Sequence, residues 1–302
     1  MKFVIDKKVN KQNNLVTIYK YNFSNLTDLY NYLRQNPEVN THIFREQASL
    51  ENNYDFGGEP LDAAIEYLRG GYEMDFEKFN IAIKDVRKFG YEDLDSRKLE
   101  KTLHGGMYLA PLVAAGVPDC MVRYRQDSEP KHITIYFQLG YPCFTTTDQV
   151  FNRGIATINL IQALEAKGYM VDLKVFKLSF NVNEYLDITI NLKNVDELLN
   201  ISKCYYPFVG KEFLRRLLFR VLESTPVETN WNCGYGKTLQ EEDIYNFYKL
   251  NKKDLIISDP SSMGITGENI YEDTATLFEN LNLSKEFDLT ELRNKVKKKS
   301  IY

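Results

Sequence analysis

An apolar, β-branched run at 132–139, HITIYFQL, constrains the fold more than any other feature of this sequence. Such a run is typical of a strand that is buried on both faces of a sheet. The segment 149–168, QVFNRGIATINLIQALEAKG, follows with a helical period and ends in glycine, and VDLKVFKLSF at 171–180 is a second strand. Strand, helix and strand joined by short turns form a right-handed unit with parallel strands. The sequence therefore predicts an α/β fold.

The alternation of strands and helices continues to residue 283. We predict, in this order, a strand at 185–192, helices at 195–202, 211–223 and 241–250, a strand within 254–260 and a helix at 270–283. Such repetition is typical of an open, mostly parallel sheet with helices on both faces. We therefore predict a Rossmann-like fold for this part of the chain.

The first hundred residues carry shorter elements. Alternating residues predict strands at 2–5 and 15–21, and helical spacing predicts helices at 26–36, 61–72 and 76–90, followed by a connection at 91–106. We expect a small α+β segment at 1–106, an α/β domain at 107–290 and a solvated basic tail at 291–302.

Composition excludes several classes of protein. A net charge of −4 and a pI near 5.6 argue against a surface that matches nucleic acid as a whole. The four cysteines are scattered without a CxxC pair, so a zinc site or a redox motif lacks its usual basis. No stretch approaches the ~20 apolar residues of a membrane span. We expect reduced thiols, no membrane and a cytoplasmic location.

Three segments combine glycines and small residues at characteristic spacing: GYEMDF at 71–76, PLVAAGVPDCM at 111–121 and NRGIATINLIQALEAKGYMVDL at 152–173. Together they resemble a family of uncharacterised proteins that are common in bacteriophage genomes. The resemblance covers roughly 56–223, and the spacing of glycines and small residues is its most specific part. It implies a viral origin and no particular chemistry.

The order strand, loop, helix, strand is also similar to a von Willebrand factor A type domain. In that family the loop after the first strand carries Asp-x-Ser-x-Ser, which binds a divalent cation that captures a carboxylate of the partner. The corresponding residues here run from Gln138 to Pro142, and that triad is missing. The oxygen ligands that remain as candidates are Thr145, Thr147, Asp148 and Asp259. The alternative is that they cap helices and close turns.

Other motifs are incomplete. Gly234 to Thr238, GYGKT, is similar to the end of a phosphate-binding loop, but Trp231 stands where its first glycine belongs. His104, Gly105 and Gly106 could line an oxyanion hole beside a cysteine nucleophile, yet no nucleophile-elbow motif accompanies them. A glycine-rich turn and buried thiols are the alternatives.

Two groups of arginines could contact nucleic acid. Arg123 and Arg125 flank Tyr124, an arrangement that single-stranded nucleic acid can use by stacking and phosphate pairing. Another group lies on the polar side of the helix predicted at 211–223 and comprises Arg215, Arg216 and Arg220. The alternatives are an edge segment that discourages strand pairing for the first group and a solvated helix face for the second group.

The interpretation that we favour is a non-enzymatic, phage-encoded protein-binding module whose partner is a viral or host protein. It would act as an antagonist of host defence or as a virion assembly factor, with no cofactor. One alternative is an enzyme or binder that uses a divalent metal or a nucleotide at the carboxyl edge of the sheet. The other is a nucleic-acid-binding protein.

Overall fold

The computed structural model describes most of the chain. The described residues are 1–302 without 10–14, 45–46, 52, 91–98, 103–106, 109–112, 115–120, 125–130, 182, 229–237, 252, 285–286 and 300–302. Within them, no helix is long and apolar enough to span a membrane.

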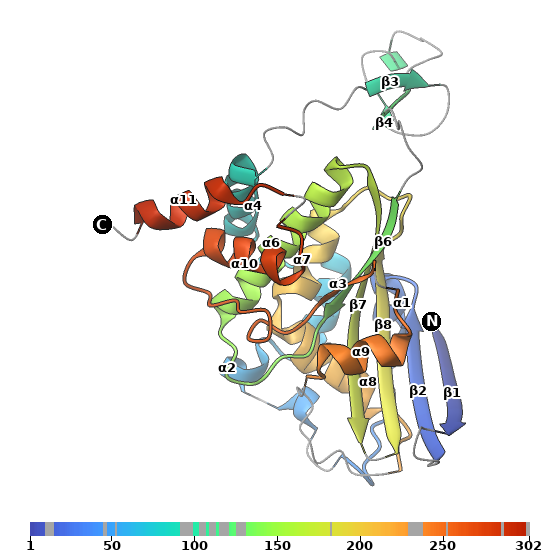
Figure 1. Cartoon of the computed structure of the whole chain (residues 1–302). Coiled ribbons are helices and arrows are strands. Elements are labelled where there is room, and N and C mark those ends of the chain that lie inside the picture. The colour runs from blue at the N-terminus through green and yellow to red at the C-terminus, as the bar shows by residue number, and fades with distance from the viewer. Residues whose placement is uncertain are drawn as a thin grey trace.

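A six-stranded mixed sheet forms the centre of the α/β fold (Figure 1). Its strands, in spatial order, are β1 (Lys2–Val9), β2 (Leu15–Phe23), β8 (Glu184–Lys193), β7 (Tyr169–Asn181), β6 (Lys131–Gln138) and β9 (Leu255–Ile257). The pairs β2/β8, β6/β7 and β6/β9 are parallel, and the pairs β1/β2 and β7/β8 are antiparallel. The parallel β6–α6–β7 unit confirms the strongest sequence prediction.

The sheet is less parallel than the sequence predicts, because β8 runs antiparallel to β7. β7 ends at Asn181 and β8 begins at Glu184, so only two residues join the strands. Parallel neighbours need a crossover of a dozen residues or more. A connection this short can form only a hairpin.

Helices cover both faces of the sheet, but unequally. The largest core cluster packs Ile135, Val175 and Ile188 against α6 and the helices around it. On the opposite face, Phe176 packs in a smaller cluster with Ile244 of α9. Figure 1 shows α9 crossing in front of β7 and β8, with α6, α7 and α10 to the left of the strands. The helices are α1 (Leu26–Arg34), α2 (Tyr54–Gly57), α3 (Leu61–Gly70), α4 (Phe76–Gly90), α6 (Thr147–Ala166), α7 (Ile201–Val209), α8 (Phe219–Glu223), α9 (Glu241–Tyr248), α10 (Ile270–Asn280) and α11 (Thr290–Lys299).

Several local predictions need correction. Residues 195–200 form a turn instead of a helix, and α7 begins at Ile201 because Asn200 caps its amide groups. The basic tail is helical up to Lys299, since Leu292 is fully buried against the core. The connection at 91–106 contains β3 (Leu99–Thr102), which joins β5 (Met121–Tyr124) and β4 (Met107–Tyr108) in a second, three-stranded sheet.

The N-terminal segment shares the sheet and the core with the rest of the chain. β2 pairs with β8, and Leu29 and Phe79 belong to the same core cluster as Ile155 and Phe213. Residues on both sides of position 106 therefore contribute to one hydrophobic core.

The helix predicted at 211–223 has a π-helical centre, Phe213–Leu218, followed by α8. The apolar side chains of this helix that are buried include Phe213, Leu214, Leu217, Leu218 and Val221. Its arginines are not on a solvated face, because the exposed fractions of Arg215, Arg216 and Arg220 are only 4, 2 and 7%. The segment before α3 covers this side of the helix, and Asn40 donates a backbone hydrogen bond to the Glu223 carbonyl at 2.8 Å.

Arg216 fixes that covering segment by donating to backbone carbonyls between residues 48 and 59. Its Nε donates to the Glu59 oxygen at 3.0 Å, and its Nη1 donates to the Glu51 oxygen at 2.5 Å. The other acceptors are the carbonyl oxygens of Ala48, Ser49, Asn53 and Gly58. A buried guanidinium needs such partners, because its five N–H groups have lost water.

Two buried carboxylates on the same helix bind the covering segment from the other side. Glu223 accepts from the Ser49 amide at 2.9 Å and from its hydroxyl at 2.5 Å. Glu212 accepts from the Glu59 amide at 3.2 Å. Residues 48–59, which we call the 48–59 loop, are therefore held by three buried charged side chains.

We expect Gly58→Ala to destabilise the protein more than Gly71→Ala. Both glycines have positive φ, +67° and +93°, so both substitutions strain the backbone. At Gly58 a Cβ would lie 2.1 Å from Glu212 Oε1, whereas Gly71 has no atom within 4 Å of such a Cβ. The clash should add about 1–3 kcal/mol to the loss in the free energy of unfolding. Urea unfolding of both variants measures the difference, and equal losses would contradict the described packing of Glu212.

Candidate functional site

The carboxyl ends of β6 and β9 lie side by side at one edge of the sheet. From β6 the chain crosses through α6 to β7 on one side, and β9 pairs with β6 on the other side. Open α/β sheets bind ligands at this kind of switch point. The edge also holds buried oxygens that have no hydrogen-bond partner among the described residues: Gln138 Oε1, Ser179 Oγ and Ser258 Oγ.

Arg153 of α6 joins the two strand ends. Its Nη1 donates to the Gln138 carbonyl at 3.0 Å and to the Ser258 carbonyl at 2.9 Å, and its guanidinium lies 4.2 Å from the Phe137 ring centre. Burial lowers the pKa of Arg153 to about 10, and the neighbouring Tyr141 and Asp259 oppose that shift. A cationic side chain thus lies between the strands, which the helical pattern of 149–168 does not reveal.

Lys177 is a second buried cation at this edge. It belongs to β7 just beyond the residue that pairs with the end of β6, and only 2% of it is exposed. A Cβ on Gly140 would lie 3.4 Å from its Nζ, so glycine leaves the lysine room. Burial, and then repulsion from Arg215, lowers the pKa of Lys177 to about 7.

A pocket of about 70 Å³ opens at the start of α6, and we call it the α6 pocket. Figure 1 shows α2 beside the loop that leads into α6, and both contribute to its wall. The lining residues are Asp55, Phe56, Tyr141, Cys143, Thr145, Thr146, Thr147, Val150, Val209, Lys211 and Arg215. Such a volume suits a single functional group, since ligand sites for whole cofactors are commonly 300–1,000 Å³.

Among the residues that line the α6 pocket, Arg215 is unusual because its charge is buried and pairs with no opposite charge on any described residue. Its Nη2 donates to the Tyr141 carbonyl at 3.2 Å, and its guanidinium lies 4.5 Å from the ring centre of Phe56 and 5.5 Å from that of Phe219. In the described part of the chain, no carboxylate pairs with Arg215. Burial lowers the pKa of Arg215. A buried charge without an opposite charge is rare, because desolvation makes it costly.

Two buried hydroxyl groups belong to the pocket wall. Thr145 Oγ1 has no hydrogen bond to any described residue, and the Tyr141 hydroxyl lies beside the Arg215 guanidinium. The neighbouring Thr146 is committed, because it caps α6 by accepting from the Gln149 amide at 3.2 Å. Buried polar atoms in folded proteins are nearly always satisfied, so unpaired ones point to a bound group or water.

The structure brings together two of the four residues predicted to bind a metal. Thr145 and Thr147 line the α6 pocket. Asp148 is exposed in the first turn of α6 and does not line it, and Asp259 accepts from Ser262 Oγ at 2.6 Å within its own turn. No group of three or more His, Cys, Asp or Glu side chains among the described residues could hold a metal ion. The metal site stays a prediction, and Arg215 would repel a cation at the pocket.

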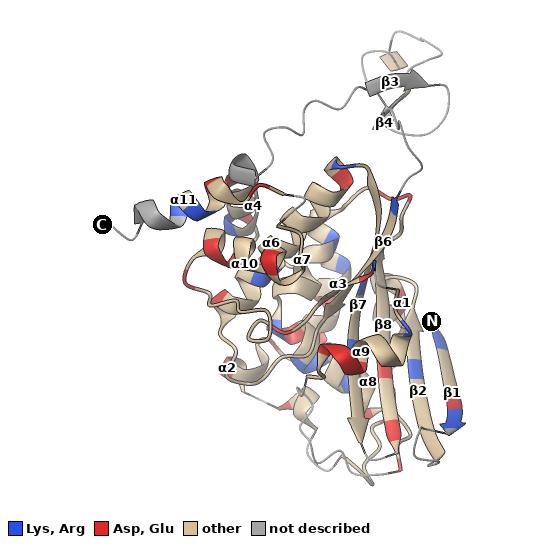
Figure 2. Cartoon of the chain, viewed as in Figure 1, with Lys and Arg blue, Asp and Glu red and all other residues tan. Residues whose placement is uncertain are grey.

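The other candidates are only partly described. Arg123 and Tyr124 belong to β5, where they pair with Glu100 and Leu99, and Arg125 lies outside the described residues. His104 to Gly106, Gly234 to Lys237, Cys120 and Cys233 also lie outside them. Burial raises the pKa of the Cys204 thiol to about 12, which makes it a poor nucleophile. Figure 2 shows acidic and basic residues together on β1, whereas β2 carries basic colour alone.

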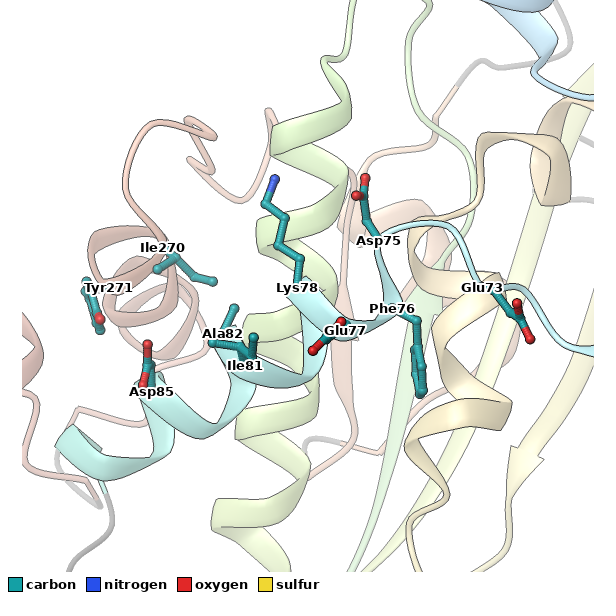
Figure 3. A pocket seen from close by; sticks show the side chains of 10 residues that line it. All are labelled: Glu73, Asp75, Phe76, Glu77, Lys78, Ile81, Ala82, Asp85, Ile270 and Tyr271. Carbon is teal, nitrogen blue, oxygen red and sulfur yellow. The ribbon is translucent and has the colours of Figure 1, made fainter.

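A larger cavity of about 670 Å³ lies between α4 and α10 (Figure 3). Its charged wall is mainly acidic, with Glu73, Asp75, Glu77 and Asp85 against Lys78. Figure 3 shows these carboxyl groups pointing in different directions rather than converging on one point. None of the ten lining residues has a buried, unpaired side-chain atom. The α6 pocket is therefore the better candidate.

We expect Lys177→Met to remove a rise in stability between pH 7 and 10.5. Below pH 7 the lysine is charged in both the folded and unfolded states, and the cost of burial is fully present. Between its folded pKa of about 7 and its ordinary value of 10.5, only the unfolded state holds the proton, so the free energy of unfolding increases with pH. Lys177→Met should be more stable than the parent at pH 6, by on the order of a few kcal/mol, and the gain should shrink toward pH 10.

Denaturant unfolding across this pH range measures the effect. Lys174→Met is the matched control, because Lys174 lies on the same strand, is 29% exposed and pairs with Asp172 at 3.2 Å. The free energy of unfolding of Lys174→Met should rise with pH as steeply as that of the parent. If the free energy of unfolding of Lys177→Met rises with pH as steeply as that of the parent, burial does not lower the pKa of Lys177.

Comparison with known proteins places the chain in a family without assigning an activity. The model of a domain of unknown function, DUF7192, matches residues 7–285. No curated protein matches the chain, and no solved structure does. Because the family model covers most of the sequence, the chain belongs to the DUF7192 family.

Proposed function

We propose that the chain is a non-enzymatic protein-binding module, and that it contacts its partner with the rim of the α6 pocket. The observation that carries the proposal is the exposure of Phe144, 73% of which is accessible. It lies between Cys143 and Thr145, which both line the pocket. Single exposed apolar residues are common on protein surfaces, but an aromatic residue at the edge of a pocket is a typical interface anchor.

A second aromatic residue lies at the same pocket. Tyr54 is 53% exposed and adjoins the lining residues Asp55 and Phe56. The Nζ of Lys211 lies 5.0 Å from its ring centre and donates to the Asp55 carbonyl at 3.2 Å. Phe144 and Tyr54 would supply apolar contact on either side of a cationic pocket. Interfaces combine aromatic anchors with polar groups in this way.

The small pocket supports binding more than catalysis of a large substrate. A volume of about 70 Å³ admits one functional group of a larger partner. A flat rim with a small recess is typical of a surface that holds another macromolecule by one inserted side chain.

We also propose that the fold is a variant of the von Willebrand A type. The loop between β6 and α6 stands where that family carries its binding loop, and β7 and β9 flank β6 as parallel neighbours. The viral origin, the host cytoplasm and the roles in host defence or virion assembly are part of this proposal. They rest on the sequence resemblance alone.

Affinity capture with matched variants tests the module. We expect one or more proteins from the native cells to be retained by the parent chain and lost by Phe144→Ala. Leu198→Ala is the control, because Leu198 is 75% exposed and follows β8 at the opposite edge of the sheet. It should retain the same proteins. If the parent and Phe144→Ala retain identical sets, the rim of the α6 pocket is not the interface.

A further inference from the structure

We propose that the α6 pocket binds one carboxylate group. For the source of that carboxylate, the inference rests on the proposed function, which would supply it as an acidic side chain or C-terminus of the protein partner. The chemistry of the pocket is the same whatever the source of the carboxylate. The pocket combines a guanidinium, two hydroxyl groups, the start of a helix and a net positive charge.

Arg215 has donors that the protein does not use. A guanidinium carries five N–H groups in a rigid fork that matches a carboxylate. Within the described part of the chain, Arg215 donates to the Tyr141 carbonyl and lies beside the Tyr141 hydroxyl. Arg216, the next residue, donates to six carbonyls and is saturated. The rings of Phe56 and Phe219 hold the Arg215 fork in place, so little conformational entropy is lost on binding.

The hydroxyl groups of Tyr141 and Thr145 add donors to the same space. Both are buried and both line the pocket, and Thr145 Oγ1 has no hydrogen-bond partner among the described residues. A hydroxyl can rotate to donate to an oxyanion. The pocket also lies at the N-terminus of the 20-residue α6, where the partial positive charge of the helix favours an anion.

The charges that line the pocket favour a monoanion. Lys211 and Arg215 contribute two positive charges and Asp55 contributes one negative charge, which leaves a net charge of one positive. A carboxylate neutralises that charge, whereas a phosphate dianion would leave one negative charge in excess. The volume of about 70 Å³ also accepts a carboxyl group and excludes a nucleotide.

Thermal unfolding in sodium acetate, with sodium chloride at equal ionic strength, tests the inference on the full chain. We expect acetate to raise the Tm above its value in chloride, with an increment that grows with the logarithm of the acetate concentration. Sodium phosphate at matched ionic strength should raise the Tm less than acetate does.

Tyr141→Phe and Thr145→Val separate binding from folding. Thr145→Val removes an unpaired buried hydroxyl, so it should unfold in chloride at the parent Tm or above it, and Tyr141→Phe should unfold close to the parent Tm. In each variant the rise in Tm that acetate causes should be at most half of that in the parent. Arg215→Lys should lose most of the rise, because lysine lacks the planar fork of N–H donors. Thr157→Val is the control, because Thr157 Oγ1 donates to the Arg153 carbonyl at 2.8 Å away from the pocket. Thr157→Val should lower the Tm in both salts, and acetate should still raise its Tm above the value in chloride by as much as in the parent.

Three results would overturn the inference. The parent could show the same Tm in acetate and in chloride, or both hydroxyl variants could show the full rise in Tm in acetate. The third such result is a larger rise in Tm in phosphate than in acetate. The two proposals fail separately. Loss of the acetate effect with Phe144-dependent capture intact overturns the carboxylate site alone. An acetate effect without Phe144-dependent capture overturns the protein-binding module alone.

Discussion

The fold depends on the hydrogen bonds and aromatic contacts that replace water around its buried arginine side chains. Moving a guanidinium into a low-dielectric interior costs several kcal/mol unless hydrogen bonds or opposite charges replace the lost hydration. Arg216 meets that requirement with carbonyl groups of the 48–59 loop, and Arg153 meets it with the carbonyls that end β6 and β9. Each arginine therefore joins segments that are far apart in sequence. Arg215 is compensated by aromatic rings and one carbonyl, and its remaining donors border a pocket.

These contacts make the candidate site a product of the whole fold. The helix of 211–223 supplies Arg215, the loop after β6 supplies Tyr141 and Thr145, and α2 supplies Phe56. The position of α2 depends on Arg216 and Glu212, which bind the 48–59 loop to the same helix. A loss of the covering segment would expose Arg215 to water and remove one of its rings. The low dielectric that strengthens an ion pair at the pocket would be lost with it.

The sequence predicts the local part of this fold well and the long-range part poorly. Strand and helix periods at 132–180 predict β6, α6 and β7 because each pattern reports burial along one element. The direction of β8 could have been predicted from the two residues between 181 and 184, whose brevity excludes a crossover. The buried arginines could not, because the same helical spacing places them opposite the apolar stripe. The groups that accept hydrogen bonds from Arg216 and Arg220 belong to residues more than 150 positions away.

The predicted metal site and the observed α6 pocket differ in the sign of their charge. Thr145 and Thr147 were identified as oxygen ligands, and they do line the pocket. A divalent cation at such a place needs carboxylates, and the nearest predicted ones point elsewhere, Asp148 to solvent and Asp259 into its own turn. In the von Willebrand A family a bound cation presents positive charge to the partner's carboxylate. Here Arg215 and Lys211, on the helix of 211–223, carry positive charge covalently in the wall of the α6 pocket. Recognition of a carboxylate would then need no metal, and it would weaken with salt only as far as the partly buried charges are screened.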